Sequence, residues 1–244
     1  MTPEQEIQFA AKLHYSFLPQ DLNNKFLDIS TINLPFRQIG GDYYSIIQID
    51  EFNTVVCICD VTGHSVTSAL LAARINTYVT THVNQDIEPC NLIKGLNEYL
   101  CKRISNTGTF TCFGCVHISH EYNEIIFGGA ALPALLHFSA EKREVEALTS
   151  ETIFLGALHP LPVDCETHKR NINKGDKLVI CTDGIIEVEN QDKELWGTKP
   201  LINILEENHH LTSFQLNDVI MHGLYNYSKN NLNDDVTLIS IGIK

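Results

Sequence analysis

The chain has 244 residues and a formal net charge of −13 at pH 7, because 30 acidic residues face 17 basic ones. Nucleic-acid binding needs clustered basic charge, so that class of function is excluded. No apolar run reaches the roughly 18–20 residues of a membrane span, and residues 1–11 show neither a signal peptide nor a lipidation pattern. These features predict a cytoplasmic globular protein without membrane or nucleic-acid partners, large enough to fold without a disulfide or a metal.

The first half of the chain predicts a helix, three strands and two more helices. Pro3 and apolar residues near a 3.6-residue period start the first helix, and Pro19 ends it. A short polar turn joins the second and third strands as a hairpin, and the third strand is apolar enough to be buried on both faces. The predicted elements are a helix over 3–17, strands over 26–35, 40–50 and 54–63, and helices over 64–82 and 91–104.

The second half predicts mainly strands, then helices and one last strand. The predicted elements are strands over 109–119, 123–130, 133–139, 144–148, 165–172 and 175–184, a mostly helical stretch over 185–230 with a turn at Trp196–Gly197, and a strand over 234–243. We expect the first three of these strands to pair as a meander. Strands with helices packed outside them indicate an α+β fold.

The eight cysteines favour buried thiols over disulfides, because no secretory signal is present and free cysteine behaves as a small apolar residue. Six lie in predicted strands: Cys57, Cys59, Cys112, Cys115, Cys165 and Cys181. Cys112 and Cys115 form a C-x-x-C pattern, followed by His117 and His120, which would suit zinc. Residues three apart on a strand point to opposite faces, so zinc is not expected there.

Aspartates stand at the ends of four apolar runs. They are Asp42, Asp60, Asp183 and the pair Asp234–Asp235. Asp is a common turn residue, which explains any one of these positions. All four together are harder to explain, because clustered carboxylates beside buried strands repel one another unless protons or divalent cations neutralise them. Oxygen ligands favour magnesium or manganese, and two such ions can share and acidify a water molecule.

Five segments carry a resemblance that runs from about residue 10 to residue 243. They are LHYSFLPQ (13–20), GGDYYS (40–45), DVTGHSVTSALLAA (60–73), CTDGIIEVEN (181–190) and NDDVTLISI (233–241). In this order they resemble the metal-dependent type 2C (PPM) serine/threonine phosphatases, and within these the bacterial SpoIIE-like branch that includes RsbU and RsbX. The resemblance implies a four-layer αββα sandwich, in which helices flank two central, mainly antiparallel β-sheets.

The same resemblance implies a metal centre at one edge of the sandwich. Its residues would be Asp42, Asp60, the backbone carbonyl of Val61, Asp183 and Asp234, with Asp235 in support. Two or three manganese or magnesium ions would bind there, bridged by Asp60, and the water that they activate would be the nucleophile.

Two more residues have roles that the resemblance implies. Arg37 stands five residues before Asp42, the spacing at which eukaryotic relatives place an arginine that binds substrate phosphate. His64 starts the helix after Asp60, and is either a proton donor to the leaving serine oxygen or a structural histidine near a helix N-terminus.

The chain is expected to divide into an N-terminal helix and linker over 1–20 and a phosphatase domain over 21–244. The helix either resembles the switch that couples sensor domains to the active site in relatives, or is a plain amphipathic packing helix. One departure from the branch lies in GGAALP (128–133), where Gly129 and Leu132 occupy the polar positions of an N-A-G-H-like stretch.

The leading hypothesis is a metal-dependent phosphoserine/phosphothreonine protein phosphatase. By resemblance, its substrate is a phosphorylated STAS-domain anti-sigma-factor antagonist in bacterial partner switching, with an activating partner or a homodimer formed through the N-terminal helix. The GGAALP departure motivates an alternative, a pseudophosphatase that binds a phosphoprotein without turnover. A hydrolase of small phosphoesters is a third hypothesis, although the chain has no G-x-x-x-x-G-K-[ST] phosphate loop.

Overall fold

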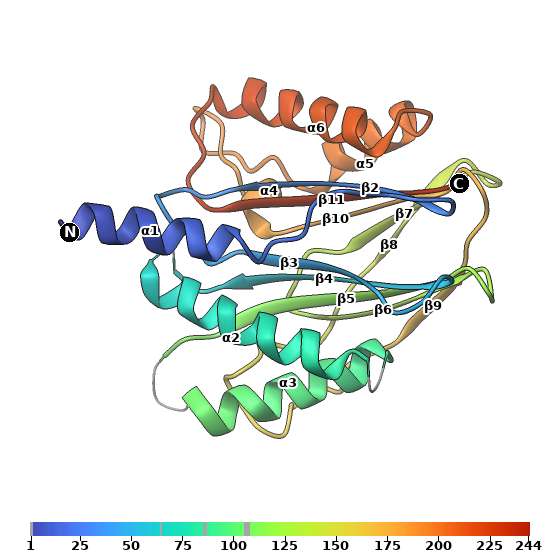
Figure 1. Cartoon of the computed structure of the whole chain (residues 1–244). Coiled ribbons are helices and arrows are strands. Elements are labelled where there is room, and N and C mark those ends of the chain that lie inside the picture. Colours follow the sequence, from blue (N-terminus) through green and yellow to red (C-terminus); the bar gives the residue numbers. More distant parts are fainter. Residues whose placement is uncertain (1, 64, 85–86, 105–107) are drawn as a thin grey trace.

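Two antiparallel β-sheets face each other, and helices cover their outer faces (Figure 1). A computed structural model describes residues 2–63, 65–84, 87–104 and 108–244. Helices, sheet, sheet and helices form the four layers of the predicted αββα sandwich, which is confirmed. No helix within these described ranges is long and apolar enough to cross a membrane.

The two sheets have six and five strands, and all neighbouring strands run antiparallel. The six-stranded sheet has the order β1 (Leu22–Asn23), β2 (Leu27–Leu34), β11 (Val236–Ile243), β10 (Lys177–Cys181), β7 (Leu135–Ser139) and β8 (Glu144–Leu148). The five-stranded sheet has the order β3 (Tyr43–Gln48), β4 (Asn53–Val61), β5 (Thr111–Ser119), β6 (Glu124–Ala130) and β9 (His168–Asn171).

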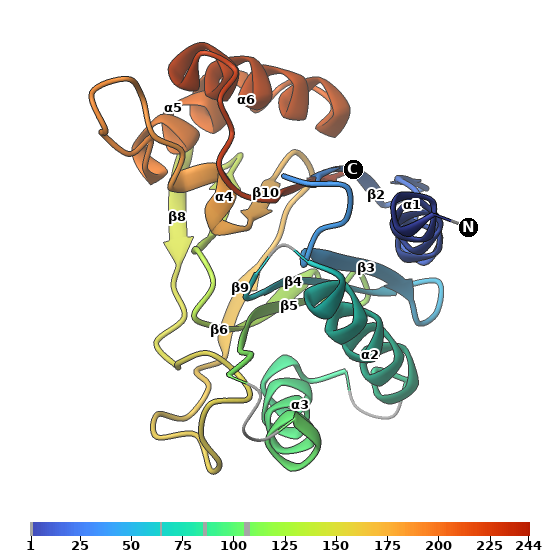
Figure 2. The same ribbon diagram turned by 90° about the vertical axis from the view of Figure 1, so that its left-hand side faces the viewer.

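Each sheet has its own pair of helices on its outer face (Figure 2). Helices α2 (Val66–His82) and α3 (Pro89–Ile104) cover the five-stranded sheet. Helices α5 (Thr198–Asn208) and α6 (Ser213–Ser228) cover the six-stranded sheet, and the single turn α4 (Asp183–Ile186) follows β10.

Helix α1 (Pro3–Tyr15) packs against α2, beside the edge of the sandwich (Figure 2). Its Ala11 meets Ile39 and Ala69 in a small apolar cluster. Pro at its first position and a capping box around Thr2 begin the helix, which fits the preference of proline for a first turn. The predicted N-terminal helix is therefore confirmed.

The alternation of side chains along β4 explains its continuous apolar run. Cys57 faces the helical layer, whereas its neighbour Ile58 faces the opposite sheet. Both residues are fully buried, because a strand in this sandwich is covered on both faces. The same alternation places Cys112 and Cys115 of β5 in different layers, as predicted for residues three apart on a strand.

The predicted meander over 109–139 is wrong in its last strand. Strands β5 and β6 pair as predicted, but β7 joins the other sheet, between β10 and β8. The chain leaves β6 through Ala131, whose φ of 51° turns the backbone sharply. Leu135 then faces the space between the sheets and Leu136 faces the α5–α6 layer, so β7 needs apolar cover on both sides.

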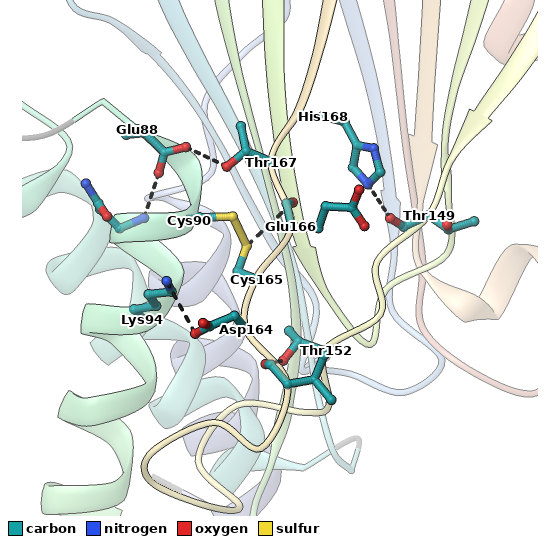
Figure 3. Close-up of a disulfide and its surroundings, with 12 residues drawn as sticks. Glu88, Cys90, Lys94, Thr149, Thr152, Asp164, Cys165, Glu166, Thr167 and His168 are labelled. Carbon is teal, nitrogen blue, oxygen red and sulfur yellow. Dashed lines mark hydrogen bonds and ion pairs between the residues drawn. A yellow bond between two sulfur atoms is a disulfide. The ribbon is translucent and has the colours of Figure 1, made fainter.

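The expectation that the cysteines are all thiols is also wrong, because Cys90 and Cys165 form a disulfide (Figure 3). Cys90 is the second residue of α3. Cys165, which is predicted to begin a strand, lies in the irregular segment before β9 (His168–Asn171). The two are 75 residues apart in sequence, and nothing in their local patterns pairs them. The other six cysteines are free.

Candidate metal and active site

The four predicted acidic positions come from distant parts of the chain and lie at one edge of the sandwich. Asp60 belongs to β4, and Asp42 directly precedes β3, the hairpin partner of β4. Asp183 begins α4 just after β10, and Asp234 lies just before β11, which pairs with β10. One strand pair in each sheet thus supplies two acids.

Asp42 connects the two sheets. Its buried Oδ2 accepts hydrogen bonds from the hydroxyls of Thr182 (2.9 Å) and Thr237 (2.6 Å). Its Oδ1 is buried as well and has no hydrogen-bond partner among the described residues. Burial, and then the nearby charge of Asp60, raise the pKa of Asp42 well above its usual range. A buried carboxylate oxygen without a partner is costly unless a proton or a cation satisfies it.

Asp60 and Asp183 show the effect of gathering carboxylates. Burial, and then the charge of Asp183, raise the pKa of Asp60 to about 7. Burial, and then the charge of Asp234, raise the pKa of Asp183 to about 6. The negatively charged form of each side chain is therefore disfavoured by a carboxylate from another segment of the chain. This is the behaviour predicted for a cluster of carboxylates whose charge must be neutralised by protons or cations.

Asp235 differs from its neighbours because its charge is already engaged by the backbone. Its Oδ1 accepts the N–H of Phe36 and its Oδ2 accepts the N–H of Gly41, both at 2.7 Å. A Cβ at Gly40 would stand 2.8–2.9 Å from the Asp235 carboxylate, so glycine permits this close contact. Asp234 is exposed and accepts the Asp235 N–H at 2.8 Å. Asp235 therefore holds the loop over 36–41, which agrees with a supporting role.

The carbonyl oxygen of Val61 lies against the second glycine of the same loop. A Cβ at Gly41 would stand 2.5 Å from that oxygen and 2.8 Å from the carbonyl oxygen of Gly63. Both carbonyls belong to the chain that leaves β4 just after Asp60. The carbonyl oxygen of Val61, the predicted backbone ligand, thus lies next to Asp60 in the chain. It can approach the loop this closely because Gly41 has no side chain.

Arg37 and His64 are the remaining predicted site residues. Arg37 is exposed on the loop over 36–41 and lines, with Ile7 and Ser65, a cavity of about 440 Å³ beside α1 and the start of α2. The loop that carries Arg37 is bonded to Asp235 through the backbone N–H groups of Phe36 and Gly41. His64 lies outside the described residues, so its role stays a prediction.

The donor set fits a hard divalent cation. All the donors are carboxylate or carbonyl oxygens, and Asp42 offers an oxygen that no described group satisfies. Within the described residues, no three His, Cys, Asp or Glu side chains already stand as a metal cage. Because the carboxylates repel one another, we expect cation binding to draw them closer together.

Sequence reasoning missed the hydroxyls that hold Asp42. Thr182 and Thr237 bond to the same carboxylate oxygen, and the Thr237 N–H donates to the Thr182 hydroxyl at 3.0 Å. Asn33 completes the network by donating to the Thr237 hydroxyl at 2.8 Å. The signal was present, since these threonines belong to the T-D-G and D-D-V-T motifs, but a threonine in a strand is ordinarily explained by β-propensity.

The raised pKa values predict how the stability of the metal-free protein depends on pH. Asp183 has a pKa of about 6 in the folded state and roughly 3.9 when unfolded, so the folded state binds more protons between these values. The free energy of unfolding should therefore rise as the pH falls through this range. Denaturant titrations in EDTA measure this free energy at about pH 8 and pH 5. Its increase between the two pH values should be roughly 1–2 kcal/mol larger for wild type than for Asp183→Asn. Equal pH dependence in the two proteins would contradict the assignment.

Two antiparallel sheets between helical layers, with acids from both sheets at one edge, define the PP2C-type phosphatase fold. The SiaA-PP2C domain of Pseudomonas aeruginosa matches with a TM-score of 0.85 and 16% identity, over 99% of this chain and 97% of that one. A structure of RsbX in complex with magnesium matches with a TM-score of 0.70 and 18% identity, over 92% and 99%. The expected fold is confirmed by both.

The chain belongs to the SpoIIE (stage II sporulation protein E) family, whose model matches residues 50–244. The phosphoserine phosphatase RsbU of Bacillus subtilis (strain 168) is 25% identical over 239 residues, covering 96% of this chain and 69% of that protein. The phosphoserine phosphatase RsbP of the same organism is 26% identical over 106 residues, covering 43% and 26%. The expected resemblance is confirmed: this is a SpoIIE-type serine/threonine phosphatase domain.

Proposed function

We propose that this chain hydrolyses phosphoserine or phosphothreonine in a protein, using two or three manganese or magnesium ions held by Asp42, Asp60, Asp183, Asp234 and the carbonyl of Val61. The observation that carries the proposal is the clustering of carboxylates at this edge: burial and neighbouring carboxylates raise the pKa values of both Asp60 and Asp183. Bound cations supply Lewis acidity, which acidifies water and polarises a phosphoryl oxygen. The similarity to two phosphoserine phosphatases supports the same reaction.

The residues around the proposed metal ligands would have separate roles in positioning, substrate binding and proton transfer. Thr182 and Thr237 fix Asp42, so that its second oxygen faces the site without rearranging. Asp235 fixes the loop that carries Arg37, which would bind the substrate phosphate as a charged donor. His64 would deliver a proton to the leaving serine oxygen. A preorganised set of this kind lowers the reorganisation that the reaction requires.

The proposed substrate is a phosphorylated STAS-domain anti-sigma-factor antagonist in a bacterial partner-switching pathway. Similarity to the phosphoserine phosphatases RsbU and RsbP supports this class. The remaining acidic surface should disfavour acidic partners, so docking would depend on local patches.

We further propose that residues 1–20 act as a regulatory element and residues 21–244 as the catalytic domain. His14 of α1 is buried beside the backbone of Asp42 and Ala69, and burial lowers its pKa. Movement of α1 would therefore displace the backbone around Asp42, the first of the proposed metal ligands in the chain. An activating partner, or a homodimer formed through α1, could supply that movement.

The GGAALP departure does not touch the acids. Leu132 is buried among the residues between the sheets, and its side chain lies over Gly114, where a Cβ would meet it at 2.6 Å. Gly129 pairs with Gly114 across β5 and β6. The departure is thus a change of core packing, and it gives the pseudophosphatase alternative no support at the metal-binding edge.

Phosphate release from a phosphoserine-carrying STAS-domain protein tests the proposal. We expect turnover with added manganese or magnesium and none in EDTA, because oxygen ligands alone cannot activate water. A nucleotide or a small aryl phosphate at equal concentration should be a poorer substrate. Tight binding of the phosphoprotein without turnover in manganese would favour the pseudophosphatase, and full activity in EDTA would exclude the metal mechanism.

A further inference from the structure

Residues 149–167 form a long irregular connection between β8 and β9 that lies against α3 (Figures 2 and 3). Most connections in compact domains are much shorter, and long ones commonly carry function. Three side chains on this segment expose large apolar surfaces to solvent: Phe154, Leu158 and Val163. We call residues 149–167 the α3 loop.

The first half of the α3 loop is attached to the strand beside Asp60. Leu155 and Thr111 exchange two backbone hydrogen bonds of 2.8 and 3.1 Å. The hydroxyl of Thr111 donates to the carbonyl oxygen of Asp60 at 2.7 Å. The buried side chain of Asn97 on α3 holds the middle of the loop, by bonding to Gly156 N and Leu158 O at 2.9 Å each.

The disulfide is the covalent link between the second half of the loop and α3. The same half also has an exposed ion pair, Lys94–Asp164 at 3.4 Å, and a hydrogen bond from Thr167 to Glu88 at 2.9 Å. Within the loop, the Thr152 hydroxyl donates to the Val163 carbonyl oxygen at 2.5 Å, and Leu161 packs against the apolar core. The Lys94 and Asp164 side chains are 48% and 86% exposed, so water and salt screen their attraction. Breaking the disulfide would leave this half of the loop without a covalent link to α3 (Figure 3).

The position of Cys90 favours exchange at this bond. It is the second residue of α3, where the helix N-terminus stabilises a thiolate. Cys165 is 9% exposed, and its neighbours Asp164 and Glu166 are exposed. Cys57 and Cys115 lie directly opposite each other on β4 and β5, are more deeply buried and remain thiols. Disulfide formation is thus selective for the pair that links the α3 loop to α3.

We propose that Cys90 and Cys165 form a reversible redox lock, which holds the α3 loop in place when closed and frees its second half when open. The proposal rests on the phosphatase function, because the loop is attached to β5, the strand that pairs with β4 and its Asp60. In a cytoplasmic protein, as the sequence predicts, thiols are kept reduced and a disulfide is ordinarily transient or regulatory.

The chemistry is thiol–disulfide exchange with a small-molecule disulfide as the oxidant. The Cys90 thiolate attacks one sulfur of that disulfide and expels one thiolate. The Cys165 thiolate then attacks the Cys90 sulfur and expels the second. Two protein thiols are oxidised and one small disulfide is reduced to two thiols. Opening starts at the other sulfur: an external thiolate attacks the Cys165 sulfur, and Cys90 leaves as the stabilised thiolate. A second external thiolate then attacks the small-molecule sulfur of the mixed disulfide, which releases the Cys165 thiolate and one small disulfide.

The test uses the full chain equilibrated in buffers with different ratios of oxidised to reduced glutathione. Thiols are then trapped by alkylation, and the Cys90–Cys165 peptide pair is measured by mass spectrometry. We expect the pair to change between disulfide and dithiol over this range, while Cys101 stays a thiol. A pair that stays oxidised in excess dithiothreitol without denaturant, or stays reduced in every buffer, would overturn the proposal.

Amide hydrogen exchange of the disulfide and dithiol forms measures how firmly the second half of the α3 loop is held. Opening should speed amide exchange in residues 159–167 roughly tenfold or more, while α6 stays unchanged. Cys165→Ser should resemble the open form in every buffer, and Cys101→Ser, a free cysteine on the same helix, should behave as wild type. Identical exchange in the two forms would overturn the proposal. Phosphatase rates are a separate readout, so an inactive protein would contradict the function without deciding the lock.

Discussion

Asp60→Asn should lose phosphatase activity by about 10²–10³-fold or more and should also lose its response to manganese. Burial, and then the charges of Asp183 and Asp234, raise the pKa of Asp60 to about 7. An amide keeps the shape of the side chain but removes the charge that attracts the cations. Steady-state rates on the phosphoprotein, in saturating manganese, measure the loss.

The thermal stability of the same variant separates lost metal binding from misfolding. Wild type should gain about 2.7 kcal/mol from a cation present at roughly 100 times its dissociation constant, whereas Asp60→Asn should gain much less. In EDTA the variant should be at least as stable as wild type, because a repelled carboxylate is gone. Asp218→Asn, on the exposed face of α6, is the matched control. An active Asp60→Asn that still responds to manganese would exclude this site.

Most of the fold could be predicted because its periodicities are local. The alternation of Cys57 and Ile58 between two apolar layers is already visible as an uninterrupted apolar strand. The helices begin at proline or at capping residues, as in α1. The sheet to which β7 belongs could not be predicted in the same way. It depends on the tertiary contacts of Leu135, which packs between the sheets, and Leu136, which packs against the α5–α6 layer.

The acids of the site were predictable because each one stands at the start or the end of an apolar run. Their common edge follows once β3–β4 and β10–β11 are paired. The hydroxyls of Thr182 and Thr237 that hold Asp42 could not be separated from ordinary strand threonines without the structure. The disulfide could not be predicted either, since Cys90 and Cys165 are joined by folding over 75 residues and neither has a local signature.

Gly184→Ala should damage the fold and the site together. A Cβ at Gly184 would lie far closer than 3.0 Å to the main-chain oxygen of Asp235, and backbone cannot swing away as a side chain can. The chain after β10 and the chain before β11 would have to separate, which would displace Asp183 from Asp234. We expect the free energy of unfolding to fall by about 1–3 kcal/mol, with a large loss of activity.

Gly223→Ala on α6 is the matched control for this expectation. Its Cβ would meet only side-chain atoms, of Ile204 at 3.2 Å and Trp196 at 3.5 Å, and alanine favours a helix by about 1 kcal/mol over glycine. Denaturant unfolding and phosphatase rates should leave Gly223→Ala close to wild type. Equal behaviour of the two variants would mean that the contact between Gly184 and Asp235 does not hold the acids in place. The presence of glycine in the T-D-G motif would then not be explained by the close approach of the segment after β10, which carries Asp183, to the segment before β11, which carries Asp234.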